Sequence, residues 1–403
     1  MREIVLISIT GEDRPGLTAA ILGVLAQGAV NILDIRQAAI HGNLAFGILV
    51  EFADAARAVS AHLDIEASLP GSAQQVRFNR LSEAEHQGWL ATSGRKRHVA
   101  TLMSRQVTAE QLQRVTAIMT RHGLEVEGID RLSAQTSEAP STLSKSCFEL
   151  SAHGELTDPQ ALRREFLNAA QELSADIALQ EDSLFRCHRR LAVFDMDSTL
   201  IEAEVIDELA KAAGVGELVS AITERAMAGE LDFRASFKER LALLKGLDVS
   251  VLDAIGASLR LTEGAEVLFA ELKRLGYKTA ILSGGFTYFA KQLQAKLGID
   301  YVFANELEVV DGKCTGVAIE PIVDAQRKAD LLRELAEKEG LSLEQTIAVG
   351  DGANDLPMLA IAGLGVAFRA KPLVRHSAKQ AISTLGLDGV LYLLGVRDRD
   401  GQR

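Results

Sequence analysis

The sequence predicts an α/β protein in which a doubly wound parallel sheet with a helical cap follows two ferredoxin-like α+β units. Three observations lead to this fold class. The chain has 403 residues, which suits two or three domains rather than one. Residues 1–182 show twice the order strand, helix, strand, strand, helix, strand. From residue 189 onward, short apolar strands alternate with helices, as in a parallel sheet covered on both faces.

The composition is that of a folded protein with neither a membrane segment nor a nucleic-acid partner. Hydrophobic residues make up 47% of the chain, enough for packed cores, and the net charge of −12 repels nucleic acid and anionic lipid. The N-terminus alternates like a strand rather than a signal peptide, and no stretch reaches the roughly 18 apolar residues of a membrane span. Cys147, Cys187 and Cys314 form no CxxC pair, which argues against disulfides and zinc and favours the reducing cytoplasm.

The first ferredoxin-like unit is predicted over residues 1–83. Its first turn reads Gly11-Glu-Asp-Arg-Pro-Gly16, and its hairpin turn reads His41-Gly42-Asn43. The expected elements are strands at 3–10, 30–39, 44–52 and near 75–79, and helices at 17–27 and near 55–63. We expect a linker over residues 82–97, which contain the basic run Arg95-Lys96-Arg97.

A second and weaker copy of this unit is predicted over residues 97–182. Its expected elements are strands at 98–103, 125–132, 144–151 and 176–180, and helices at 109–122 and 158–174. The similar length and order of the two units indicate a tandem repeat.

The third region, residues 187–403, is predicted to form the parallel sheet. The expected elements are strands at 191–194, 278–282, 346–349 and 364–368, a hairpin at 307–319, helices at 265–275 and 324–339, and helical sequence over about 203–257. Ligands of such a sheet bind outside the carboxyl ends of its strands, so the residues that follow each strand are the candidates for a site.

Three polar clusters follow strands of this region, and one lysine lies early in a helix. The clusters are Asp195-Met-Asp-Ser-Thr199, Ser283-Gly-Gly285 and Gly350-Asp-Gly-Ala-Asn-Asp355, and the lysine is Lys328. Each one alone has an ordinary structural explanation, as an acidic loop, a turn or a solvated side chain. Their order along the chain, with a strand before each cluster, favours convergence on one crevice.

The residue types in this crevice point to phosphoryl transfer. Asp195 and Asp351 offer hard oxygen ligands that suit Mg²⁺, with Mn²⁺ as the alternative. A carboxylate nucleophile would form an aspartyl-phosphate, while a second carboxylate protonates the leaving alkoxide and then activates water. Ser283 and the Gly284 N–H offer hydrogen bonds to phosphate, and Lys328 offers the positive charge that balances its oxygens.

The four sequence features resemble the four motifs of the haloacid dehalogenase superfamily, over residues 187–395. The resemblance implies that Asp195 is the nucleophile and Asp197 the general acid and base. It implies a Mg²⁺ held by the Asp195 side chain, the Asp197 carbonyl and Asp351, with support from Asp355. Asn354 would contact phosphate. The second aspartate of the first motif is typically absent from dehalogenases, so its presence here favours a phosphatase.

The detail resembles the phosphoserine phosphatases within that superfamily, which implies hydrolysis of O-phospho-L-serine, the last step of serine biosynthesis. The insert at about 203–262 would be the cap that selects the leaving group. By the same resemblance, Glu204 would pair with the ammonium and Arg240 would bind the carboxylate in a bidentate manner. Phe233 resembles the apolar residue that shields the family's pocket, although plain packing in the cap explains it nearly as well. A broader phosphomonoesterase or phosphotransferase is the alternative.

Residues 1–80 resemble an ACT domain, a ferredoxin-like module that often binds amino acids. The resemblance rests on the 11–16 turn and on Gly28-Ala-Val-Asn-Ile-Leu-Asp34. It implies a serine effector site with Asp13, Gly16 and Asn31, because a helix N-terminus can hold a carboxylate. The second unit reads Met103-Ser-Arg-Gln-Val-Thr108 at the equivalent turn, without Asp or Gly, so a structural or dimerising role is expected there.

Pairing of ACT sheets implies a homodimer. A non-catalytic amino-acid sensor is the remaining alternative, and the presence of Asp195, Asp197, Lys328 and Asp351 opposes it, because a sensor does not need them.

Overall fold

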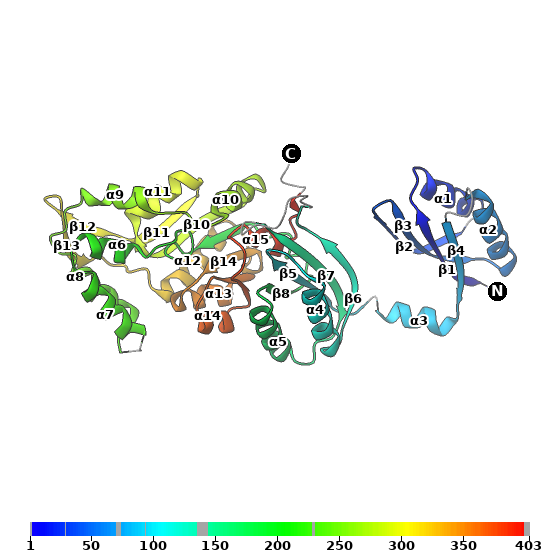
Figure 1. Ribbon diagram of the computed structural model, residues 1–403, viewed down its shortest axis with the longest axis horizontal. Helices are drawn as coiled ribbons and strands as arrows, with labels where there is room; N and C mark the ends of the chain where they lie inside the picture. Colours follow the sequence, from blue (N-terminus) through cyan, green and yellow to red (C-terminus); the bar gives the residue numbers. More distant parts are fainter. Residues whose placement is uncertain are drawn as a thin grey trace. The chain divides into compact units, whose positions relative to one another are not determined.

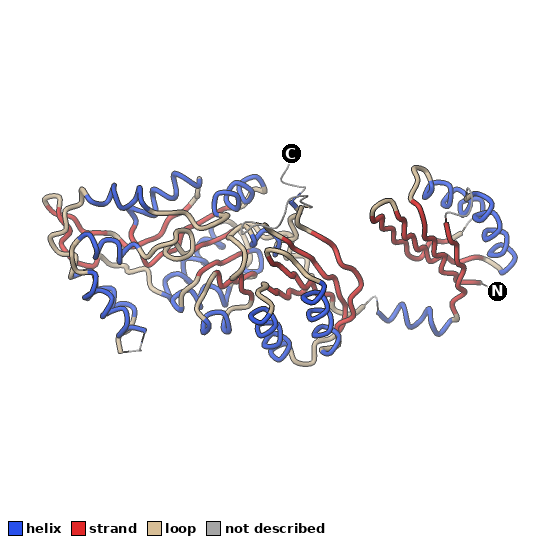
Figure 2. The backbone as a smooth tube through the Cα atoms, in the orientation of Figure 1, coloured by secondary structure: helices blue, strands red, loops and turns tan. Residues whose placement is uncertain are grey.

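The computed structural model describes residues 2–28, 30–69, 74–92, 94–134, 144–227 and 230–398 (Figures 1 and 2). The chain forms two compact units, Met1–Arg95 and Lys96–Arg403, which are described separately below. In the part of the chain that the structure describes, no helix has the length and apolar character needed to cross a membrane.

The first unit is an antiparallel sheet with two helices packed on one face. The sheet has the order β2-β3-β1-β4, and the two helices are α1 and α2. Alternate residues of β1, such as Val5, Ile7 and Ile9, are buried against Ile21 and Ile65 of the helices, as expected for a sheet with one covered face. The bounds are β1 Glu3–Glu12, α1 Leu17–Gln27, β2 Asn31–Ile40, β3 Asn43–Phe52, α2 Ala55–Ser68 and β4 Gln74–Leu81.

A helix follows this sheet where the sequence predicted a linker. Helix α3 (Glu83–Thr92) occupies most of residues 82–97. Its start is held by Ser82 and Glu85, because the Glu85 carboxylate accepts hydrogen bonds from the Ser82 backbone N–H and hydroxyl. The helical character of this predicted linker was not identified from the sequence, because its capping pattern was not recognised.

The second unit begins with a sheet of the same topology, in the order β6-β7-β5-β8. Helices α4 and α5 cover one face of it, and both begin at capping side chains, Thr108 and Asp158. The tandem repeat of ferredoxin-like folds is thus present in the structure. The bounds are β5 Arg97–Ser104, α4 Ala109–Arg121, β6 Leu124–Arg131, β7 Ser146–Gly154, α5 Pro159–Glu172 and β8 Asp176–Glu181.

The remainder of this unit contains a parallel sheet with the order β11-β10-β9-β14-β15-β16. Alternate residues of its central strand face opposite cores: Phe194 faces α10 and α11, and Val193 faces α12 and α13. The doubly wound sheet is confirmed, and the short edge strands β11 and β16 are additions to the prediction. The bounds are β9 Leu191–Phe194, α10 Ala265–Arg274, β10 Lys278–Phe286, α11 Thr287–Leu297, β11 Tyr301–Asn305, α12 Ala325–Lys338, β14 Thr346–Gly350, α13 Leu356–Ile361, β15 Leu364–Phe368, α14 Pro372–Ser377, β16 Gln380–Ile382 and α15 Gly389–Leu393.

The insert between β9 and α10 forms the helical cap. Its described helices are α6 Val205–Ala212, α7 Gly216–Met227, α8 Phe233–Ala242 and α9 Val251–Ser258. A hairpin, β12 Leu307–Val310 and β13 Lys313–Ala318, packs beside it, and the Cys314 N–H donates to the Leu247 carbonyl there at 2.8 Å. Leu241 of the cap and Phe286 of the sheet belong to one core, so the cap and the sheet share apolar contacts.

The second ferredoxin-like sheet lies beside the region of the parallel sheet (Figure 1), where β8 contacts β16. Polar contacts join the two. The buried Asp176 carboxylate, at the start of β8, accepts hydrogen bonds from the backbone N–H groups of Ser383, Thr384 and Leu385. Arg105 binds Glu263 through two hydrogen bonds of 2.6 and 2.8 Å. Buried, charge-assisted contacts of this kind specify one docking geometry, because an unpaired buried carboxylate is costly.

Candidate active site

The loop after β9 places two carboxylates at the carboxyl end of the central strand. All four residues of β9 are buried, and the Asp195 N–H donates to the Val349 carbonyl of the adjacent strand at 2.9 Å. The chain then turns back at Ser198, a non-glycine residue with a φ of 56°, in the left-handed region. The Ser198 hydroxyl donates to Glu204 at 2.7 Å, which helps to hold this unusual conformation.

Asp195 lies in a cluster of three carboxylates. Ligand oxygens of Asp195, Asp351 and Asp355 lie within 4.8 Å of one another. Burial, followed by repulsion from Asp195 and other carboxylates, raises the pKa of Asp351 to about 8 and that of Asp355 to about 7. A divalent cation would relieve this repulsion, and carboxylate oxygens are the donors that Mg²⁺ prefers, so the cluster fits such an ion.

A hydroxyl orients one of these carboxylates. The fully buried Thr199 donates its hydroxyl hydrogen to Asp351 Oδ1 at 3.0 Å. Sequence reasoning did not assign Thr199 a role, although it belongs to the first polar cluster. Its position four residues after Asp195 suggests a place in the site, but its partner Asp351 lies 152 positions away in the chain.

Lys328 is fully buried and bridges two of the carboxylates. Its ammonium lies 2.8 Å from Asp195 Oδ1 and 2.7 Å from Asp355 Oδ1. Helix α12 begins at Asp324, whose side chain caps the Arg327 N–H, and this places Lys328 in the first turn. Burial alone would lower the pKa of Lys328, but Asp195 and Asp355 outweigh burial and raise it.

Asp197 has the properties of a proton donor. Its Oδ1 accepts a hydrogen bond from the Val205 N–H at 3.0 Å. Burial, together with the charges of Glu204 and Asp195, raises its pKa well above the ordinary range. A raised pKa favours the protonated carboxyl, which can donate a proton to a leaving group. The Asp197 side chain is not part of the three-carboxylate cluster.

Ser283 and Gly284 lie where a bulge shifts the end of β10 against β11. The prediction ended this strand at Leu282, but extended backbone continues to Phe286. The buried Ser283 hydroxyl oxygen accepts from the Gly285 N–H at 2.9 Å. A Cβ atom on Gly284 would lie 2.8 Å from Cζ of Phe233, so the cap packs directly on this glycine.

Asn305 holds this segment in place and was not identified from the sequence. It is buried at the end of β11, where its amide donates to the Gly284 carbonyl at 2.8 Å. Its side-chain oxygen accepts from the Val323 N–H at 2.8 Å, just before α12. Asn305 thus connects the Ser283 segment to the start of the helix that carries Lys328. Its signal, a polar residue at the end of an apolar strand, was missed because β11 itself was not predicted.

Arg240 and Glu204 lie near each other at the cap side of the site. Arg240, on α8, is half-buried, and no described carboxylate lies within 4.0 Å of its guanidinium. Burial lowers the pKa of Arg240, whereas the charges of Glu204, Asp207 and Asp197 oppose that shift. Glu204 keeps accessible surface, but the surrounding protein still desolvates its carboxylate and raises its pKa. The two cap residues thus interact electrostatically with the site, Glu204 with Asp195 and Arg240 with Asp197.

Of the remaining predicted site residues, Asn354 lies just after β14, and the three predicted effector residues lie in the first unit. Asn354 is half-buried, and its side-chain oxygen lies 2.2 Å from the position of a Cβ atom on Gly352. In the first unit, Gly16 has a φ of 89° directly before α1. The Asp13 N–H donates to the Gly42 carbonyl at 2.7 Å, and the Asn31 amide donates to Glu51 at 3.4 Å. Asp13, Gly16 and Asn31 are exposed, and no described hydrogen bond joins them to one another.

Comparison with known proteins agrees with this fold and site. Residues 192–360 match a model of haloacid dehalogenase-like hydrolases, and residues 3–79 match a model of ACT domains. The parallel sheet is therefore that of a hydrolase of the haloacid dehalogenase type.

Relatives that match almost the whole chain identify a narrower family within these hydrolases. A phosphoserine phosphatase of Streptomyces coelicolor is 41% identical over 97% of this chain and 92% of its own length. Phosphoserine phosphatase SerB2 of Mycobacterium tuberculosis is 39% identical over 97% of this chain and 93% of its own length. A solved hydrolase structure of this type from Salmonella enterica covers 73% of this chain and 98% of its own, with 31% identity and a TM-score of 0.64. The chain belongs to the phosphoserine phosphatase family.

We expect the substitution Lys328→Met to lower the free energy of unfolding by about 3–5 kcal/mol, because it leaves buried carboxylates without their cation. Chemical denaturation of the metal-free protein would measure the loss. Lys291→Met is the matched control, since Lys291 lies exposed on α11, and we expect it to cost less than about 0.5 kcal/mol. Equal losses in the two variants would contradict the bridging role of Lys328.

Proposed function

We propose that this protein hydrolyses O-phospho-L-serine to L-serine and phosphate through an aspartyl-phosphate on Asp195, the last step of serine biosynthesis. The observation that carries the proposal is the buried contact of Lys328 with Asp195 at 2.8 Å, at the strand end nearest the cap residues. A nucleophilic carboxylate needs a fixed position and a balanced charge, and Lys328 supplies both.

Two steps follow from the arrangement. In the first step, an Asp195 oxygen attacks phosphorus, the bond from phosphorus to the serine oxygen breaks, and the Asp197 carboxyl gives its proton to that oxygen. In the second step, Asp197, now a carboxylate, takes a proton from a water molecule that attacks the phosphorus. The bond to Asp195 then breaks and phosphate leaves. Ser283, the Gly284 N–H, Asn354 and Lys328 would bind the phosphoryl oxygens.

Mg²⁺ is the proposed cofactor. The ion would be held by Asp195, Asp351 and the backbone carbonyl of Asp197, and Asp355 would support these ligands. When bound, the ion supplies positive charge that neutralises the carboxylates and the phosphate. Thr199, whose hydroxyl donates to Asp351 Oδ1, would fix the orientation of that carboxylate.

The cap residues would choose the leaving group. Phosphoserine carries an ammonium and a carboxylate besides its phosphate, so a selective pocket needs one anion and one cation. Glu204 would bind the ammonium. Arg240, which has no described carboxylate partner, would bind the carboxylate through two parallel hydrogen bonds. Phe233, seated on Gly284, would keep water from the bound substrate.

The ferredoxin-like part suggests regulation and assembly. We propose ACT domains at residues 1–83 and 97–182, before a phosphatase domain at 187–403, with serine as effector at Asp13, Gly16 and Asn31. The edge strand β2 exposes Ile32, Ile35 and Ile40, which supports a homodimer through this edge. In the second domain, Arg105 of the 103–108 turn binds Glu263, which supports a structural rather than a ligand-binding role there.

We expect Asp195→Asn to lower the turnover of phosphoserine by at least about a thousandfold while the fold remains intact, because an amide cannot form the aspartyl-phosphate. Phosphate release with Mg²⁺ measures turnover, and circular dichroism checks the fold. Asp330→Asn, on α12 with a side chain that is 42% exposed, is the control and should keep normal activity. Substantial turnover by a folded Asp195→Asn protein would refute the nucleophile assignment.

We expect Arg240→Ala to reduce kcat/KM for phosphoserine by about 10- to 100-fold, the loss of a charge-assisted contact. Hydrolysis of 4-nitrophenyl phosphate, which has no carboxylate, should change much less. Lys238→Ala, on the exposed face of the same helix, is the control for both substrates. If Arg240→Ala impairs both substrates equally, Arg240 does not bind the carboxylate.

We expect added L-serine to inhibit the wild-type enzyme at concentrations at which Asp13→Ala is still active, because Asp13 would bind the serine ammonium. The half-inhibitory serine concentration should rise about tenfold in Asp13→Ala, as for the loss of a charged hydrogen bond. Asp64→Ala, an exposed change on α2 of the same unit, serves as the control. Identical inhibition curves for the two variants would rule out an effector site at Asp13.

A further inference from the structure

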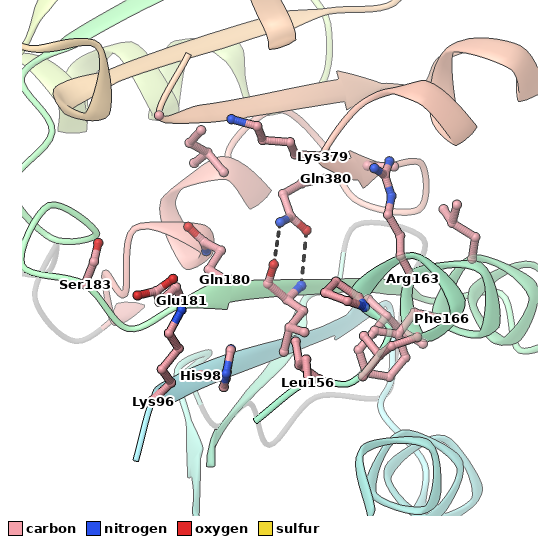
Figure 3. A pocket seen from close by; sticks show the side chains of 18 of the residues that line it. Lys96, His98, Leu156, Arg163, Phe166, Gln180, Glu181, Ser183, Lys379 and Gln380 are labelled. Atoms are coloured by element: carbon pink, nitrogen blue, oxygen red, sulfur yellow. Dashed lines mark hydrogen bonds between the residues drawn. The ribbon is translucent and has the colours of Figure 1, made fainter. Parts of the chain in front are cut away.

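A cavity of about 750 Å³ lies between the second ferredoxin-like sheet and the edge of the parallel sheet (Figure 3). One wall comes from β8 and α5, and the opposite wall comes from residues 363–364 and 379–381. The two walls meet where the Gln380 side chain bonds both the N–H and the carbonyl of Leu179, at 3.1 and 2.6 Å. The cavity is separate from the carboxylate crevice, and none of its lining residues belongs to the proposed catalytic set.

Part of the cavity lining is apolar and comes from both sheets and from α5. The side chains that provide this surface are Leu156, Leu162, Phe166, Ile177, Leu179 and Leu364. Phe166 is directed to the same space as Leu156 in the close view (Figure 3). An apolar surface of this kind favours a ligand with a hydrocarbon body.

Four cationic side chains line the same cavity: Lys96, Arg163, Arg189 and Lys379. None of them forms an ion pair among the residues that the structure describes, although the chain has a net charge of −12. Arg163 donates to the Arg375 carbonyl at 3.3 Å, and Lys379 donates to the Ala362 carbonyl at 3.1 Å. Backbone carbonyls satisfy donors but do not neutralise charge. The lining holds two carboxylates, Glu155 and Glu181, against four cations, so it has a net positive charge that an anion would balance.

Two buried polar groups in the lining also lack partners. Arg189 is 5% exposed and donates to the Arg186 carbonyl and to Gln180, but its Nε has no hydrogen-bond acceptor. His98 is 7% exposed, and its Nε2 has no partner either. Burial lowers the pKa of Arg189 to about 10, so its guanidinium remains charged at neutral pH. Buried polar groups in folded proteins have a partner in most cases, so these two nitrogens would accept water or a bound molecule as theirs.

We propose that this cavity binds a small organic carboxylate with an apolar body. The carboxylate would take the hydrogen bonds of Arg163, Arg189 and Lys379, and the hydrocarbon part would cover the apolar lining. Glu155 and Glu181 also line the cavity, so an α-amino acid with an apolar side chain could in addition place its ammonium there. The shared chemistry is the apolar carboxylate, and the experiment below distinguishes these two sources.

Calorimetric titration of the full-length protein tests the proposal with three probes that differ by one group each. The probes are 3-phenylpropanoate, L-phenylalanine and the neutral 3-phenylpropan-1-ol. We expect at least one of the two carboxylates to bind saturably, one per chain, and the alcohol to bind at least about tenfold more weakly, because it lacks the charge. Comparing the two carboxylates shows whether the ammonium is recognised. The proposal fails if neither carboxylate saturates up to about 10 mM, or if the alcohol binds as tightly.

Substitutions in the cavity lining test whether the carboxylate probe binds there. Arg163→Gln and Lys379→Gln should each weaken the binding carboxylate by about fivefold or more while leaving phosphatase activity unchanged. Arg164→Gln, exposed and next in sequence on α5, is the matched control and should bind normally. Arg240→Ala should also bind the probe normally. If Arg240→Ala abolishes binding and Arg163→Gln does not, the probe occupies the crevice under the cap and the proposal is wrong.

Discussion

The contact of one buried lysine with two aspartates organises this molecule. Lys328 has no exposed surface and holds both Asp195 and Asp355, in a chain whose overall charge is −12. Such a contact forms only if the start of α12 lies against the ends of β9 and β14. Asn305 enforces that position, because it bonds Val323 just before the helix and Gly284 at the end of β10. The order of the strands and the edge strand β11 thus both serve to place Lys328 between the two carboxylates.

The two ferredoxin-like units differ at the turn between their first strand and first helix. The first copy has Gly and Asp at its strand–helix turn, whereas the second has Arg105 at the equivalent place. Arg105 and Arg369 both bind Glu263, which directly follows the cap insert. Asp176 adds a second connection through the backbone at 383–385. In the second copy this turn therefore binds another part of the chain, through the ion pair of Arg105 with Glu263.

Much of the fold and of the crevice could be predicted because local signals determine them. Apolar strands between helices implied a parallel sheet, and polar residues after the strands implied a site at one edge. The structure brings Asp195, Asp351 and Lys328 together there. Other features depend on partners far away in the chain. The short strand that carries Asn305 forms by pairing with β10, and the role of Thr199 depends on its contact with Asp351. Helix α3 was missed because its cap was overlooked.

The contact of Phe233 with Gly284 has a consequence for which residues positions 233 and 284 can hold. The ring ends 2.8 Å from the point where any other residue at 284 would carry its first side-chain atom. A side chain at position 284 would therefore collide with Phe233 unless the ring moved. The sheet and the cap meet closely at this point because position 284 has no side chain, so each of the two positions constrains the size of the other.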